Sequence, residues 1–169
     1  MKKLFLTTLC ILTLVGCSST KKEEEAVIIT EETANTQIAT PFHEVTSLSE
    51  ATKDAGFNFN IPSEISGSSM CTYLVYDSDM NMLDIRYGTS ENVTAYVRKC
   101  EGTTENLSGD YNAYDETKTV IINDTDVTLK SNEDAVYVAE WSKDGYSYSL
   151  KVVQGLSEAE ITEVISNID

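Results

Sequence analysis

Seven short runs of β-branched and aromatic residues, each ended by turn-forming residues, occupy most of the chain between residues 72 and 152. They cover residues 72–76, 82–87, 93–99, 118–122, 126–130, 135–141 and 146–152. Runs of this composition and spacing are typical of strands, and short connections such as Asp144-Gly145 favour antiparallel hairpins. The pattern therefore predicts an antiparallel, curved sheet of about seven strands.

The last hairpin can be given a register. A two-residue turn at Asp144-Gly145 places Trp141 opposite Tyr148. A three-residue turn would set Trp141 against Ser147 and leave its face half polar. We therefore expect the two-residue turn, which collects six side chains on one buried face: Tyr137, Ala139, Trp141, Tyr148, Leu150 and Val152.

A short helix is expected before the strands. Ser47 and Glu50 have the spacing of a capping box, and Gly56 is suited to end a helix over about 48–55. Phe57, Phe59 and Ile61 then alternate before Pro62, which predicts a short strand over 57–61.

A second helix is expected at the C-terminus. Ser157 and Glu160 repeat the capping-box spacing, and one face then carries an apolar stripe of Ile161, Val164, Ile165 and Ile168. The stripe should pack on the sheet. Helix, strands and helix in this order predict an α+β fold, with a short N-terminal helix and a C-terminal helix packed on it.

The first residues have the features of an export signal. Lys2 and Lys3 precede an apolar run over 4–15, which as a helix spans roughly 20 Å and so is shorter than the ~30 Å hydrocarbon core of a bilayer. A cleaved signal is therefore favoured over a transmembrane anchor.

The end of this run, Leu14-Val15-Gly16-Cys17, resembles the lipobox of bacterial lipoproteins. The resemblance implies a signal peptide over residues 1–16, cleavage before Cys17 and a diacylglyceryl group on that cysteine. Acylation with two or more chains, palmitate included, gives a stable anchor. We therefore expect a lipid-anchored protein on the outer face of the cytoplasmic membrane, with the membrane as a partner through Cys17.

Charge limits the partners of the chain. It has 12 Lys and Arg against 28 Asp and Glu, and the net charge of −16 argues against nucleic acid as a partner because phosphate recognition needs a basic face. After loss of residues 1–16, 10 basic residues remain against 28 acids, a charge of −18.

Residues 17–40 lack apolar periodicity and predict a flexible acidic tether, followed by a single domain at 41–169.

Several segments of that domain carry a family resemblance. They are Pro41-Phe42, Ala55-Gly56-Phe57 through Ile61-Pro62, Val97-Arg98-Lys99, Ser108-Gly109-Asp110-Tyr111-Asn112 with Tyr114, and Trp141 to Tyr148. The body resembles an uncharacterised family of exported Firmicute domains, found in small lipoproteins and at the C-terminus of anti-sigma-factor-like membrane proteins. The resemblance implies an extracytoplasmic binding or sensing role and supplies no catalytic residues.

Few residues are candidates for catalysis or metal binding. His43 could serve a hydrolase triad, but it lies at the domain edge and the chain has no G-x-S-x-G sequence. Cys71 and Cys100 would lie two strands apart in a simple meander, beyond the ~7 Å Cα limit of a disulfide, so two isolated thiols are expected. The sequence 77–81 begins like a calcium loop, but Met82 and Gly88 break the pattern. We therefore expect no metal and no cofactor.

A polar, aromatic loop is the best candidate for binding. Gly109, Asp110, Tyr111 and Tyr114 lie between strand patterns, where loops on a rigid sheet often carry binding residues. A structural role is the alternative, in which Gly109 turns the chain and the tyrosines cover a sheet edge.

Taken together, these features predict a non-enzymatic, lipid-anchored binding or sensing module, with an extracellular protein, wall component or ligand as its partner. A carrier of an apolar ligand between the sheet and the C-terminal helix is the first alternative, and a hydrolase is the second.

Overall fold

The computed structural model describes residues 41–76 and 80–169. They belong to the second of the two compact units into which the chain divides, Ile38–Asp169. The predicted signal, Cys17 and the predicted tether lie outside the described residues, as do positions 77–79 of the calcium-like sequence.

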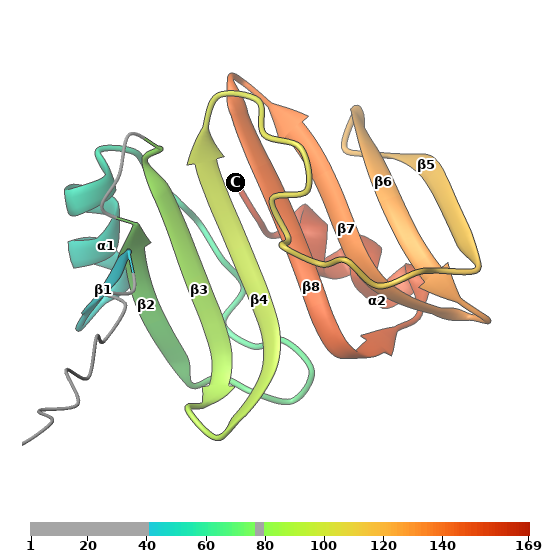
Figure 1. The fold of residues 1–169 in the computed structure, drawn as a ribbon, viewed down its shortest axis with the longest axis horizontal. Helices are drawn as coiled ribbons and strands as arrows, with labels where there is room; N and C mark the ends of the chain where they lie inside the picture. Colours follow the sequence, from blue (N-terminus) through green and yellow to red (C-terminus); the bar gives the residue numbers. More distant parts are fainter. Residues whose placement is uncertain (1–40, 77–79) are drawn as a thin grey trace, which may run out of the picture. The chain divides into compact units, whose positions relative to one another are not determined.

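An antiparallel sheet of eight strands forms the body, in the order β1-β2-β3-β4-β8-β7-β6-β5 (Figure 1). The strands are β1 (Phe42–Val45), β2 (Cys71–Tyr76), β3 (Met82–Thr89), β4 (Asn92–Glu101), β5 (Glu116–Ile122), β6 (Thr125–Asn132), β7 (Ala135–Lys143) and β8 (Tyr146–Leu156). The seven predicted runs are β2 to β8, so the α+β architecture with an antiparallel sheet is confirmed.

The predicted number of strands is one too low because β1 was missed. β1 pairs with β2 from Phe42↔Tyr76 to Val45↔Tyr73. Its four residues include His43 and Glu44, so the local pattern is too short and too polar to indicate a strand. Pairing with a distant strand, rather than local propensity, makes this segment extended.

The strand predicted over 57–61 is wrong. In the structure this segment is irregular, and Asn60 exchanges two backbone hydrogen bonds with Asp169, at N–O distances of 2.8 and 3.2 Å. Phe57 and Phe59 are both buried in the core. The alternation of apolar residues therefore reflects the packing of two aromatic rings on the core, not a place in the sheet.

The first predicted helix is confirmed as α1 (Leu48–Ala55). The Ser47 hydroxyl accepts a hydrogen bond from the backbone N–H of Glu50, as a cap should, but the Glu50 carboxylate turns to the backbone N–H of Thr46 at 2.9 Å. Gly56 ends the helix in the left-handed region with φ 79°, a conformation that costs glycine little.

The second helix, α2 (Glu158–Ser166), begins with a complete capping box between Ser157 and Glu160. Ile161, Ile165 and Ile168 of its predicted stripe are buried in the same core cluster as the inner face of the sheet, with the partly buried Val164 against it. The helix is therefore packed on the sheet, as predicted. Its apolar face fills the core.

The register predicted for the last hairpin is confirmed. Trp141 pairs with Tyr148 and Ala139 with Leu150. The prediction fails at Tyr137, because a register shift between Val136 and Val138 moves it off the core face. Its ring lies 6.0 Å from that of Tyr114 instead, and Val136 occupies the core position.

The other face of the sheet is crossed by the long β4–β5 connection. β8 lies next to β4, so the chain must pass β8, β7 and β6 to reach β5 at the edge. The connection, residues 102–115, is called the crossing loop below. It passes in front of β8 and β7 in Figure 1, with α2 behind them.

Candidate functional site

Charged side chains line the face beneath the crossing loop. Arg98 of β4, Glu140 of β7, Lys130 of β6 and Lys151 of β8 come from neighbouring strands at positions that alternate with core residues. The core residues beside them are Val97, Ala139, Leu129 and Leu150. Because successive side chains of a strand point to opposite faces, this polar face is set by the same pattern that builds the core.

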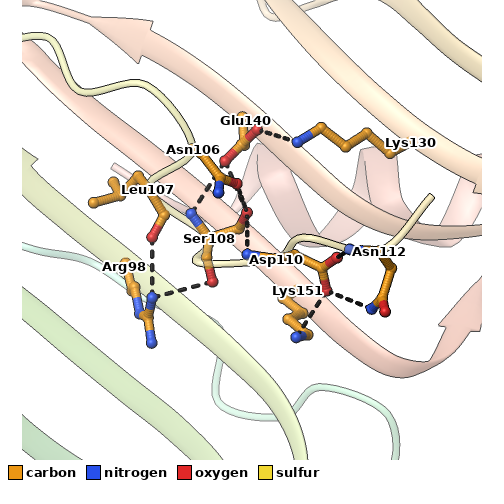
Figure 2. A network of polar contacts seen from close by, with 9 residues as sticks. All are labelled: Arg98, Asn106, Leu107, Ser108, Asp110, Asn112, Lys130, Glu140 and Lys151. Atoms are coloured by element: carbon orange, nitrogen blue, oxygen red, sulfur yellow. Dashed lines mark hydrogen bonds and ion pairs between the residues drawn. The ribbon is translucent and has the colours of Figure 1, made fainter. Parts of the chain in front are cut away.

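Two of these charged residues hold the middle of the loop by its backbone, as Figure 2 shows. Arg98 donates from Nη1 to the carbonyl oxygens of Leu107 and Ser108, at 3.0 and 3.1 Å. Glu140 accepts from the backbone N–H and the hydroxyl of Ser108 at Oε1, at 3.1 and 2.8 Å, while its Oε2 pairs with Lys130 at 2.8 Å. Strand side chains therefore bind the carbonyl oxygens of Leu107 and Ser108 and the backbone N–H of Ser108.

A third attachment is the ion pair of Asp110 and Lys151, with 2.7 Å between Oδ2 and Nζ. The Asp110 side chain is fully buried and also accepts from the backbone and side-chain N–H groups of Asn112, at 2.9 and 3.2 Å. Burial alone would raise the pKa of Asp110, but the hydrogen bonds from Lys151 and Asn112 and the charge of Lys151 outweigh it and lower the pKa below its ordinary value.

Arg98 also connects the loop to β3. Asp84, a fully buried carboxylate, lies 2.9 Å from Arg86 Nη2 and 3.1 Å from Arg98 Nε. Arg98 also donates a hydrogen bond from Nη2 to Asp84 Oδ2 at 3.4 Å, whereas the contact between Arg98 Nε and Asp84 Oδ1 lacks hydrogen-bond geometry and is Coulombic. A chain of alternating charge thus runs from Arg86 through Asp84 and Arg98 to the loop carbonyls.

The structure separates the four residues predicted for the binding loop. Gly109 turns at φ 63°, and a Cβ there would lie 3.0 Å from Arg98 Nη1, so glycine is favoured at this position by conformation and by space. Asp110 is an attachment point, and Tyr114 packs against Tyr137 and hydrogen-bonds Asp110. Only Tyr111 points to solvent, with 91% of its surface exposed.

A second cluster was missed by sequence reasoning. Lys99 of β4 is only 6% exposed, and its ammonium group lies 4.6 to 5.6 Å from the centroids of four aromatic rings. The rings belong to Phe57, Phe59, Tyr146 and Tyr148. Lys99 also donates to the carbonyl oxygen of Asn58 at 2.7 Å, and burial lowers the pKa of its ammonium group. These four rings form an aromatic box around the ammonium group. Because the protein's own lysine fills the aromatic box, we interpret it as structural.

The other candidate residues are dispersed. His43 Nε2 lies 3.5 Å from Asp54 Oδ2, with both side chains about two-fifths exposed. Cys71 pairs with Tyr87 and Cys100 with Met82, at opposite ends of β3, and both thiols are free as predicted. Within residues 41–76 and 80–169, no three His, Cys, Asp or Glu side chains are placed to hold a metal ion.

Open pockets flank the crossing loop and α2. One of about 450 Å³ lies between residues 104–107 and the strands β6 and β7, and one of about 420 Å³ lies between residues 62–67 and α2. The described helices include none long and apolar enough to cross a bilayer.

A comparison with family models, curated proteins and solved structures finds no match to this chain.

Proposed function

We propose that the protein is a non-enzymatic, lipid-anchored binding module on the outer face of the cytoplasmic membrane, and that Tyr111 on the crossing loop contacts its partner. The partner is an extracellular protein, a wall component or a ligand. Anchoring rests on the lipobox-like sequence that ends at Cys17. The binding role rests on the arrangement of the loop.

The observation that carries the proposal is the contrast between Tyr111 and the two attached residues of the loop, Asp110 and Tyr114. Asp110 is buried and ion-paired, and Tyr114 is packed on Tyr137, yet Tyr111 is 91% exposed. Because the chain is attached on both sides of Tyr111, binding costs little backbone entropy there, and tyrosine is among the residues that contribute most to interfaces. Loops held on a rigid sheet are frequent sites of recognition.

The anchoring half of the proposal is tested by fractionation of cells that express the chain with Cys17→Ala. The variant should leave the membrane fraction, whereas the wild type stays there until detergent is added. A matched Ser18→Ala variant should behave as wild type. A Cys17→Ala variant that still sediments with membranes would show that the anchor is not the lipid on Cys17.

The binding half is tested by photo-crosslinking on intact cells. A photoreactive phenylalanine analogue at position 111 should give one discrete adduct, and the same group at the exposed Met70 should not. A second chain with the group at 111 and Asp110→Asn should give less of the adduct because the attachment beside position 111 is weakened. No adduct at 111, or the same adducts from both positions, would contradict the role of Tyr111.

A further inference from the structure

Within residues 41–76 and 80–169, the strand β5 leaves one edge of the sheet open. Among the described residues only β6 pairs with it, over seven residues and with no register shift. Natural sheets protect such edges with short strands, prolines, bulges or covering segments. β5 contains no proline and no bulge. The opposite edge strand, β1, has only four residues and contacts α1.

The β5–β6 turn determines which backbone groups face outward. Asn123 and Asp124 both have positive φ, 49° and 59°, as a type I′ two-residue turn requires. In such a hairpin the flanking pair, Ile122 and Thr125, exchanges both hydrogen bonds, and bonded pairs then alternate with non-bonded ones. The N–H and C=O groups of Thr117, Thr119 and Ile121 therefore point away from β6, to the open edge.

The side chains of these three residues keep that edge accessible. All three are exposed on the face opposite α2, and Ile121 is 75% exposed. Lysine on an edge strand commonly blocks pairing, but Lys118 points to the other face and bonds Glu158 at 2.7 Å. In the part of the chain that the structure describes, the edge thus offers backbone groups beside an apolar side chain, with no free cation over them.

The charge around the edge indicates what it would accept. Residues 115–134, which form the hairpin and its ends, hold six Asp and Glu but only two Lys. Both lysines are paired, Lys118 with Glu158 and Lys130 with Glu140. The surface beside β5 is therefore acidic, and it complements an extended segment that carries lysine or arginine.

We propose that β5 binds an extended, basic segment of a partner protein as an added strand. This goes beyond the proposed function, since it uses a surface other than Tyr111 and does not need it. Backbone hydrogen bonds from Thr117, Thr119 and Ile121 supply the pairing, and the surrounding carboxylates select a basic segment.

The test uses the purified full chain in detergent and a short fluorescent peptide of alternating valine and lysine, followed by anisotropy. Thr119→Pro removes an N–H that faces the open edge without removing a β5–β6 hydrogen bond, so it should weaken binding by about tenfold or more. Thr119→Val keeps the N–H and should bind as wild type. A peptide with glutamate in place of lysine should not bind, and added salt should weaken the lysine peptide.

Ile121→Lys is a second variant that leaves the backbone intact. It places a cation on the exposed face, so it should also weaken the basic peptide even if Thr119→Pro disturbs the fold. Equal binding by wild type and both variants, or no binding by wild type, would overturn the proposal. A wild-type dimer in light scattering that Thr119→Pro makes monomeric would also overturn it, in favour of a second copy. Tyr111→Ala should leave peptide binding unchanged, so this test and that of Tyr111 fail independently.

Discussion

Replacing Asp110 with Asn should weaken the attachment of the crossing loop to the sheet. Removing one partner of a fully buried pair costs roughly 3–5 kcal/mol. Lys151 is 31% exposed and can regain water, and an amide still accepts a hydrogen bond from Asn112, so we expect a loss of about 2 kcal/mol. This corresponds to about a thirtyfold change in an equilibrium constant.

Hydrogen exchange followed by mass spectrometry can locate this loss. Backbone amides of residues 106–112 should exchange up to about thirtyfold faster in Asp110→Asn through local opening, whereas amides of β8 and β4 follow global unfolding. Asp115→Asn removes the same charge from an exposed position of the same loop. It should change stability by less than about 0.5 kcal/mol and leave loop exchange unaltered.

The difference in stability between wild type and Asp110→Asn should depend on pH in one direction. Because the folded-state pKa of Asp110 lies below its unfolded value, its stabilisation is fully present above the unfolded pKa of about 3.9 and is lost as pH falls through the folded pKa. The gap between wild type and Asp110→Asn should be constant above about pH 5 and close at lower pH. An equal gap at all pH values, or unchanged exchange of the loop, would refute the assignment of Asp110 as its attachment.

Three further predictions concern the core and the thiols. Trp141 is 7% exposed and stacks on Tyr148 with ring centroids 5.2 Å apart. Trp141→Ala should therefore lower the free energy of unfolding in denaturant by about 3–5 kcal/mol. A loss below about 1 kcal/mol would place Trp141 outside the core. The stability of Lys99→Met should stay within about 1 kcal/mol of wild type because this change removes a desolvated charge but keeps the packing. Lys99→Ala should lose about 2–4 kcal/mol of stability. Equal losses in the two variants would show that the charge itself holds the rings. The unfolded, unreduced chain should label at both Cys71 and Cys100, while in the native protein the buried Cys100 should react more slowly; a chain that labels at neither would contain a disulfide.

Local chemistry explains which parts of the fold were predictable. The Asp144-Gly145 turn, with φ 52° and 85°, determines the pairing of Trp141 and Tyr148 within a few residues of the chain. β1 depends instead on pairing with β2, which begins at Cys71, and its own four residues, with His43 and Glu44 in the middle, are too few and too polar to indicate a strand. The Tyr137 error has a related cause, because an alternating pattern does not reveal where a bulge inserts one residue, as Tyr137 is inserted in β7 opposite Lys130 and Ser131 of β6.

The polar network was not predictable because its partners are distant in sequence. Asp110 and Lys151 are 41 positions apart, as are Lys99 and Asn58, and Ser108 and Glu140 are separated by 32. One signal was nevertheless available: Asp84 stands between Leu83 and Ile85 inside a strand pattern. A charge at such a position indicates a paired group on the second face of the sheet, but it does not identify the partner.

The placement of the cations leaves few free positive charges among the acids of the domain. Residues 41–169 contain eight Lys and Arg against 23 Asp and Glu, and seven of the eight are in ion pairs or in the aromatic box. These seven are Arg86 and Arg98 with Asp84, Lys99 in the box, Lys118 with Glu158, Lys130 with Glu140, Lys143 with Asp169, and Lys151 with Asp110. The remaining acids outnumber the cations left to balance them, so the domain repels anionic lipid headgroups and attracts basic partners over about a Debye length, ~8–10 Å. Association with a basic segment should therefore be fast at low ionic strength and slow as salt is added. A binding rate that is independent of salt would show that apolar contact, not charge, selects the partner.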